Sequence, residues 1–481
     1  MIAHRALLHV PIVRNFSLSL ASRAVSLGAN LAYVAVTARH FSLQDVAVIA
    51  IIGILTILMD TGKGLGLGTY LLKHLPKLPP QGDPRAASLV LSYLVYSAAI
   101  PAMVALLSAV AAASIAKYFL GNGQSAGLVR LGLLIGLLTV LTNTNLVILQ
   151  ARQKFGSYAG QTILSSLCQR LFPILPVLWM KADLQSFLSW SCAFAAAGLV
   201  ASCAPLTGTM QGAALLAPRD FWPESRHFYY ASLLRFGSTQ LDQVIAAAMF
   251  SPATLAVYYM LRRLYSMAAL TINSLMDALV PDLSRQAGAD TEAARGRMQR
   301  WVRGSIMAGG VGGAMLAGNG RLLTRLALGD GYAEDQLLIV LFSLAAFSYL
   351  LFTLGQVNLM LFQDPHRSLR LALLAAILNT VLTPLLASIA GLRGLPLAMS
   401  ISYLLSLELV RRAAPDAYWK QSRLWTAVGI ILAAGLLAAA APWAGEAWVQ
   451  AITVNALILL ASSLWIHRHW DQVMFTIRRP A

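Results

Sequence analysis

Charged residues are scarce in this chain. Only 11% of its 481 residues are Asp, Glu, Lys or Arg, whereas 58% are hydrophobic. A soluble globular domain carries about 25% charged residues, so the composition excludes an ordinary soluble fold. Apolar runs of about 20 residues recur along almost the whole length, and each is long enough to cross a bilayer as a helix. The runs are continuous rather than alternating, which disfavours a membrane β-barrel.

Acidic residues are scarcer than basic residues. The chain has 19 Asp and Glu against 36 Lys and Arg, which gives a net charge of +17. Such an excess could suit a nucleic-acid partner. However, the basic residues concentrate in short connectors between the apolar runs, where the topology of membrane proteins places them. We therefore expect no nucleic-acid partner. No small-residue cleavage site follows the first apolar run near residue 12, so we also expect no cleavable leader.

Cysteines and catalytic patterns are equally sparse. The three cysteines, Cys168, Cys192 and Cys203, lie inside apolar runs at a spacing that fits no metal site. We interpret them as small packing residues and expect neither a metal nor a cofactor. The chain lacks the His-Glu-x-x-His and Gly-x-Ser-x-Gly patterns, and its 8 histidines lie mostly in connectors and termini. These features argue against an enzyme.

Hydropathy predicts an all-α polytopic membrane protein of about fourteen helices. The expected spans are 12–38, 44–70, 86–114, 127–149, 158–180, 185–208, 228–250, 253–281, 301–323, 335–361, 368–388, 393–411, 423–443 and 448–466. Basic residues are concentrated in every second connector, most densely in 282–300. Because Lys and Arg accumulate on the cytoplasmic side, we predict an inner-membrane protein with both termini in the cytoplasm.

An internal repeat is visible at an offset of about 212 residues. The matched residues are Arg14, Phe16, Arg23 and Asn30 with Arg226, Phe228, Arg235 and Asp242; Phe41-Ser42 with Phe250-Ser251; and Asn145-Leu146 with Asn358-Leu359. The repeat maps helices 1–6 (residues 1–210) onto helices 7–12 (residues 211–413). Residues 414–481 would add two helices and a cytoplasmic tail. Two six-helix lobes of equal orientation are typical of transporters whose substrate site lies between the lobes.

Ionisable side chains inside the predicted spans form the candidate site, because such groups usually face a bundle interior or water. The candidates for binding an anionic substrate are Arg23, Lys63, Arg235, Arg262 and Arg263. Arg23 and Arg235 are repeat mates, and facing guanidinium groups suit a phosphate because each presents a fork of donors. The alternative is that these cations snorkel or pair locally, as Lys63 could with Asp60. Asp242 and Asp277 could carry a coupling proton or merely neutralise neighbouring arginines.

The sequence Gly62-Lys63-Gly64-Leu65-Gly66-Leu67-Gly68 places four glycines at alternate positions near the end of the second predicted span. No strand precedes this run and no Gly-Lys-Ser/Thr ending follows it, so it does not match a phosphate-binding loop. Close packing or a flexible helix end is the expected role.

Several segments resemble the polysaccharide transporter (Wzx-like flippase) branch of the multidrug/oligosaccharidyl-lipid/polysaccharide (MOP) superfamily. They are Arg14-Asn-Phe16 with Arg23, Phe41 through Asp45, Asp60-Thr61-Gly62, Ala256-Val257-Tyr258, Val280 through Arg285, and Leu328 through Tyr332. The resemblance covers about residues 12–412. It implies alternating access by two lobes and the transfer of undecaprenyl-diphosphate-linked oligosaccharide to the periplasmic leaflet, for envelope or exopolysaccharide synthesis such as lipopolysaccharide. Its partners would be membrane lipids, a polysaccharide polymerase and a chain-length regulator.

Three alternatives stay open. A cation-coupled multidrug exporter belongs to the same superfamily, but its cationic substrates would favour a cavity richer in carboxylates. A lipid II flippase is also compatible with fourteen helices. A membrane polysaccharide polymerase or ligase is a different class, against which the repeat and the short outer loops argue.

Overall fold

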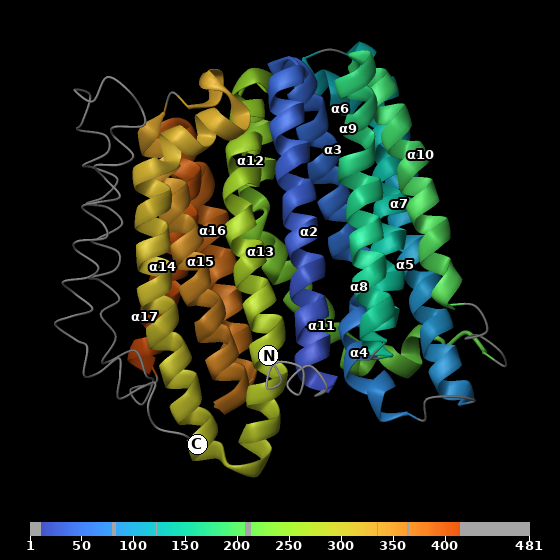
Figure 1. Cartoon of the computed structure of the whole chain (residues 1–481), viewed down its shortest axis with the longest axis vertical. Coiled ribbons are helices and arrows are strands. Elements are labelled where there is room, and N and C mark those ends of the chain that lie inside the picture. The colour runs from blue at the N-terminus through green and yellow to red at the C-terminus, as the bar shows by residue number, and fades with distance from the viewer. Residues whose placement is uncertain are drawn as a thin grey trace, which may run out of the picture. The chain divides into compact units, whose positions relative to one another are not determined.

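The computed structural model describes residues 11–78, 83–121, 123–152, 154–206, 213–333, 335–362 and 365–413. Within these residues the regular structure is helical and contains no strand (Figure 1). The predicted all-α membrane fold is therefore confirmed. The predicted helices at 423–443 and 448–466 lie outside the described residues. By internal packing the chain forms two compact units, residues 1–236 with 247–259, and residues 237–246 with 260–481.

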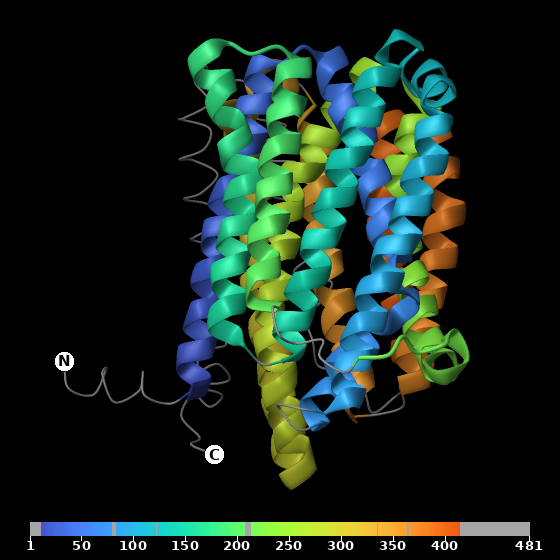
Figure 2. The ribbon, with the colours of Figure 1, turned by 90° about the vertical axis from the view of Figure 1, so that its right-hand side faces the viewer.

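The first unit contains the helices of the N-terminal half. They are α2 (Pro11–His40), α3 (Leu43–Gly62), α4 (Leu67–His74), α5 (Pro84–Val110), α6 (Ala112–Leu120), α7 (Ala126–Ala151), α8 (Phe155–Ser166), α9 (Phe172–Met180), α10 (Leu184–Cys203) and α11 (Pro218–Thr239) up to Phe236. A 3-10 segment, η1 (Lys63–Gly66), joins α3 to α4, and a π-helical segment, η4 (Leu167–Leu171), joins α8 to α9. Within this unit α7 and α10 lie side by side in both views (Figures 1 and 2).

The second unit is built mainly from the long helices that follow. They are α12 (Leu241–Met249), α13 (Pro252–Ala289), α14 (Thr291–Leu328), α15 (Gln336–Phe362), α16 (Pro365–Ala390) and α17 (Gly394–Ala413). Residues 247–259, which end α12 and begin α13, group with the first unit instead. The predicted lobe boundaries at 210 and 413 stay predictions.

Short polar residues start several helices, as capping chemistry requires. Ser42 and Asp45 form a reciprocal capping box at α3, in which Asp45 N donates to Ser42 Oγ and Ser42 N donates to Asp45 Oδ2. Asp83, Asp183 and Asp290 accept backbone N–H groups at the first turns of α5, α10 and α14. Each cap satisfies a donor that the helix itself leaves unpaired. Four of the 19 acidic residues therefore serve to begin helices.

Seven stretches of the described residues are long and apolar enough to cross a membrane. They are Leu43–His74, Pro84–Val110, Ala126–Ala151, Phe155–Met180, Leu184–Leu206, Gln336–Met360 and Arg367–Leu409. The long helices α2, α13 and α14 are not among them. With its 30 residues, α2 is about 45 Å long, which exceeds the hydrocarbon thickness of a bilayer. The candidate cations Arg23, Arg262 and Arg263 lie on α2 and α13. These arginines lower the mean hydropathy of the two helices.

The glycine run interrupts the second predicted span with a left-handed turn. Gly64, Leu65 and Gly66 have φ values of 67°, 50° and 81°, a region that side chains other than glycine rarely adopt. A Cβ added to Gly64 would lie 2.5 Å from Ser97 Oγ, and one added to Gly66 would lie 2.3 Å from the carbonyl oxygen of Ser225. The packing role expected for the run is thus observed at these two positions, where the backbone conformation and the lack of space both require glycine.

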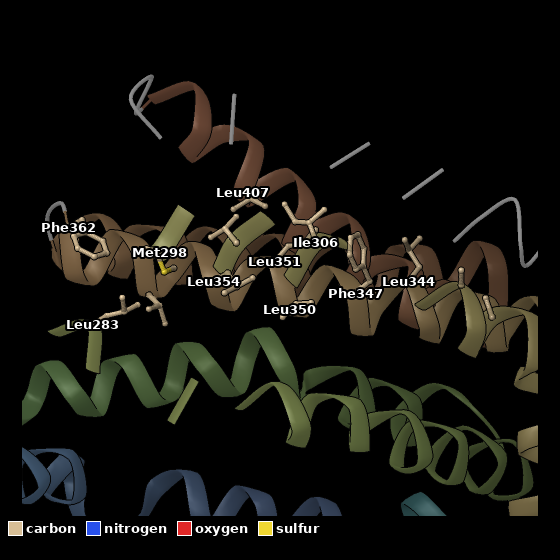
Figure 3. Packing of buried hydrophobic residues seen from close by; sticks show 14 of the residues in the cluster. Leu283, Met298, Ile306, Leu344, Phe347, Leu350, Leu351, Leu354, Phe362 and Leu407 are labelled. Atoms are coloured by element: carbon tan, nitrogen blue, oxygen red, sulfur yellow. The ribbon is translucent and has the colours of Figure 1, made fainter. Parts of the chain in front are cut away.

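The cores of both units consist of aliphatic and aromatic side chains on facing helices. Figure 3 shows the largest cluster of the second unit, in which α14 and α15 pack through Met298, Ile306, Phe347, Leu351 and Leu354. In the first unit a cluster that includes Leu67, Leu71 and Tyr93 extends to Phe221 on α11. Burying one such side chain contributes about 1.5–3 kcal/mol in water. Phe221 therefore ties α11 firmly to the helices of the first unit.

Candidate functional site

A helix break within the second unit forms a buried polar site. α11 ends at Thr239 and α12 begins at Leu241, so the seventh predicted span is interrupted at Gln240. Its repeat mate α2 runs without interruption from Pro11 to His40. A break leaves carbonyl groups without intrahelical partners, and lipid offers no water to satisfy them. The freed carbonyls must therefore find donors on neighbouring helices.

Three side chains from three other helices supply these donors. Asn379 Nδ2 on α16 donates to Gly237 O at 2.9 Å, Tyr403 Oη on α17 donates to Ser238 O at 2.6 Å, and Arg262 Nη2 on α13 donates to Thr239 O at 2.7 Å. Thr383 Oγ1, one turn from Asn379, donates to Asn379 Oδ1 at 3.0 Å. This bond orients the amide so that its nitrogen faces the break. Hydrogen bonds from three other helices thus stabilise the break.

Asp242 lies in the first turn of α12, directly after the break, and its side chain is 0% exposed. Arg262 Nε donates to Asp242 Oδ2 at 2.9 Å, and the arginine side chain is 14% exposed. The partial positive charge at the start of α12 also favours a carboxylate here. Arg262 therefore contacts both the acid and the carbonyl of Thr239, so one guanidinium holds the break together from α13.

The structure brings two predicted site residues together in this pair, Asp242 and Arg262. The sequence predicted that the acid could neutralise a neighbouring arginine, and Arg262 is such a partner. Arg263, the next residue, is half-buried. Asp277 lies in 270–282, whose side chains are outside the described part of α13. The roles of Asp242 and Asp277 in ion coupling stay predictions.

The predicted cations of the first unit lie on different helices. Lys63 Nζ contacts Asp60 Oδ1 at 2.6 Å, and the Asp60 side chain is 43% exposed, so the local pairing offered as the alternative exists. Arg23 is half-buried on α2, one turn before Ser26. Arg170, on the π-helical segment, donates from Nη1 to the carbonyl of Ser26 at 3.4 Å. Two basic residues from two helices, Arg23 and Arg170, thus lie near Ser26. The sequence analysis did not select Arg170.

Arg235 is exposed and lies on the part of α11 that packs with the first unit. The repeat mates Arg23 and Arg235 therefore belong to the same compact unit, although the repeat assigns them to different halves. The start of α11 is held to the first unit by Phe221 and Glu224, which contact α4 or its cluster. The first compact unit thus continues along α11 to Phe236.

The segment 213–217 before α11 is fixed along α5 by a ladder of polar side chains. Ala214 N donates to Ser88 Oγ at 3.0 Å, Leu216 N donates to Ser92 Oγ at 2.9 Å, and Tyr96 Oη donates to Leu216 O at 3.0 Å. Ser88, Ser92 and Tyr96 are spaced four residues apart, so they share one face of α5. This spacing was visible in the sequence, but without a known partner it resembled ordinary small-residue packing.

The start of α11 is held to α4 by charge as well. Glu224 Oε1 accepts from Lys73 Nζ at 2.8 Å and lies 3.0 Å from His74 Nε2. The hydrogen bonds from Lys73 and His74 lower the pKa of the Glu224 carboxyl. Lys73 Nζ also lies 5.9 Å above the ring of Phe228. Together the ladder and this cluster dock residues 213–228 on the first unit; we call this segment the strap.

Comparison with known proteins identifies the class of this fold. A family model described as "Lipid II flippase MurJ" matches residues 45–466. Among curated proteins, none matches the sequence. A solved structure described as lipid II flippase MurJ in an inward closed conformation is similar at 12% identity and a TM-score of 0.70, covering 95% of this chain and 99% of that chain.

Multidrug transporters share the fold at similarly low identity. An inward-facing multidrug resistance MATE family transporter of the MOP superfamily is 14% identical with a TM-score of 0.64, covering 85% of this chain and 99% of that chain. A Vibrio cholerae MATE transporter is 13% identical with a TM-score of 0.61, covering 86% of this chain and 98% of that chain. At such identities the likeness concerns the fold alone.

Proposed function

Because the chain belongs to the lipid II flippase MurJ family, we propose that it transfers lipid II across the bacterial inner membrane by alternating access. The match of the family model over residues 45–466 carries this proposal. It favours the lipid II alternative over the polysaccharide (Wzx-like) substrate to which the sequence resemblance first pointed. Both substrates attach their sugars to a lipid through a diphosphate, so the same anionic group must be bound in either case.

The charges of the spans support an anionic substrate. Arg23, Lys63, Arg235 and Arg263 would bind the diphosphate, since a guanidinium can present two donors to neighbouring phosphate oxygens. Arg262 is also a candidate, although its guanidinium is already engaged by Asp242 and by the carbonyl of Thr239. A cationic drug would be repelled by these groups, which argues against a multidrug exporter despite the MATE-like fold.

The test is complementation of a bacterium depleted of its own lipid II flippase. Expression of the chain should restore growth and remove the lipid II that accumulates on the cytoplasmic side. The variant Arg23→Ala/Arg235→Ala should be inserted at normal levels but restore neither. Arg325→Ala, which changes an exposed arginine beside Asp330, is the matched control and should behave as the wild type.

The oligosaccharide alternative has its own test. A second strain that lacks its polysaccharide flippase would be complemented instead, and its surface polymer restored, if the substrate is a lipid-linked oligosaccharide of polysaccharide synthesis. Failure to restore growth in the first strain, together with restored polymer in the second, would refute the lipid II proposal. Normal rescue by the double alanine variant would refute the assignment of the two arginines.

A further inference from the structure

The outer face of α11 combines exposed basic and aromatic residues. Arg219, Pro223, Arg226 and Tyr230 are spaced three or four residues apart, so they lie on one side of the helix. The Arg219 side chain is 89% exposed, Tyr230 is 50% exposed, and Arg226 is exposed as well. This side carries an aromatic cluster, in which the ring centroid of Trp222 lies 5.9 Å from Tyr229 and 6.5 Å from Tyr230.

The opposite face of the same helix is fixed to the first unit. Phe221 is 2% exposed and Ser225 is 0% exposed, and the Ser225 carbonyl packs against Gly66 in the left-handed turn. The orientation of the basic face is therefore set by the fold. A rotation of the helix that buried Arg219 and Arg226 would remove Phe221 from its cluster.

The acidic residues of this helix do not cancel the positive charge of the outer face. Asp220 Oδ2 accepts from Ala217 N at 3.0 Å, although its other oxygen lies 3.8 Å from Arg219 Nε, an exposed pair of little strength. Glu224 faces α4, where Lys73 and His74 engage it. The outer face therefore attracts anions.

The strap is bonded close to one end of the α5 span. It is bonded to Ser88 and Ser92, which stand four and eight residues after Pro84, where the span of α5 begins. At 1.5 Å per residue these positions lie about 6 and 12 Å into that span. The headgroup layer is about 5–8 Å thick on each side of the hydrocarbon core. Trp and Tyr beside Arg are the side chains that favour this layer.

We propose that the outer face of α11, formed by Arg219, Trp222, Arg226 and Tyr230, is a binding surface for the headgroups of anionic phospholipids. The two arginines supply charge complementarity to the phosphates, and the aromatic rings occupy the boundary between headgroups and acyl chains. The lipid would hold the strap at the bilayer surface from outside while the α5 ladder and Glu224 hold it from inside. The surface shares none of its residues with the diphosphate site proposed above.

The experiment measures which lipid contacts this face in the full-length protein. The three native cysteines are replaced by serine, Pro223→Cys is introduced on the outer face, and a fluorophore is attached to it. The protein is reconstituted in phosphatidylcholine with increasing fractions of brominated phosphatidylglycerol or brominated phosphatidylcholine. Because bromine quenches by contact, the two quenching curves give the relative affinity of the face for the anionic lipid.

Phosphatidylglycerol should be preferred by about fivefold for each arginine at the surface, and the preference should shrink in high salt. Arg219→Gln/Arg226→Gln should reduce the preference to near one, whereas Arg303→Gln, an exposed arginine of α14, should leave it unchanged. Equal quenching by both lipids in the wild type would overturn the proposal, as would an unchanged preference in the double variant. So would the absence of quenching by either lipid, because the face would then lie in water.

Discussion

Replacing Arg262 by Met should destabilise the protein strongly, because it leaves the carboxylate of Asp242 buried without its counter-charge. The Asp242 side chain is 0% exposed and its bond to Arg262 Nε is 2.9 Å long. Removing one partner of such a pair costs about 3–5 kcal/mol. The variant also removes the donor to Thr239 O, and a lost hydrogen bond adds about 1 kcal/mol. We expect a total loss of about 4–6 kcal/mol in the free energy of unfolding.

The double variant Asp242→Leu/Arg262→Met removes both charges and should recover most of this loss. Buried ion pairs can often be replaced by apolar side chains at little cost. Equilibrium unfolding in mixed micelles, applied to both single variants and the double variant, gives the coupling energy of the pair. A coupling energy below about 1 kcal/mol would refute the reasoning, because a desolvated pair with this geometry cannot be so weak.

The same double variant separates the two roles predicted for Asp242. If the acid serves only to hold the helix break, flipping should return together with stability. If the acid carries a coupling proton or ion, or if Arg262 binds the substrate, stability should return while flipping stays lost. The variant Asp242→Asn, which keeps Arg262, assigns the loss to the acid if flipping is lost there as well. Flipping by proteoliposomes, measured with the stability of the same preparations, distinguishes these outcomes.

Three further predictions concern the strap and the turn beneath it. Gly66→Ala should lower the free energy of unfolding by at least about 1–2 kcal/mol in a thermal unfolding assay, because φ is 81° and the new Cβ would lie 2.3 Å from Ser225 O. Gly62→Ala should be tolerated, because the nearest neighbour of its Cβ would lie at 3.9 Å. Because folding lowers the pKa of Glu224, this carboxylate contributes fully to the stability of the folded state above the ordinary carboxyl pKa. That contribution is lost as the pH falls through the pKa of Glu224 in the folded protein. The protection factors of residues 213–228, which are the intrinsic exchange rate at each pH divided by the observed rate, should therefore fall in acid, and Glu224→Gln should abolish that fall. Ser92→Ala should accelerate exchange at Leu216 N at every pH, and equal exchange rates in the two proteins would contradict the ladder.

The composition determined the class of fold, because a helix in lipid must satisfy its own backbone and the apolar runs are long enough to do so. The sequence also selected the residues whose burial is costly, such as Asp242 and Arg262, since ionisable groups within a span need a partner or a ligand. For the glycine run the sequence predicted close packing or a flexible helix end, and close packing is found at Gly64 and Gly66.

The tertiary structure alone decided which partners these residues have. Asp242 could reach several arginines by sequence spacing, and the tertiary structure shows that Arg262 of α13 contacts it. Asn379, Tyr403 and the Ser88–Tyr96 ladder look like ordinary span residues until the backbone groups that they satisfy are known. Helical periodicity specifies which face a side chain occupies, but not which carbonyl, freed by a break far away in the chain, will lie opposite it. That choice depends on how the helices pack together.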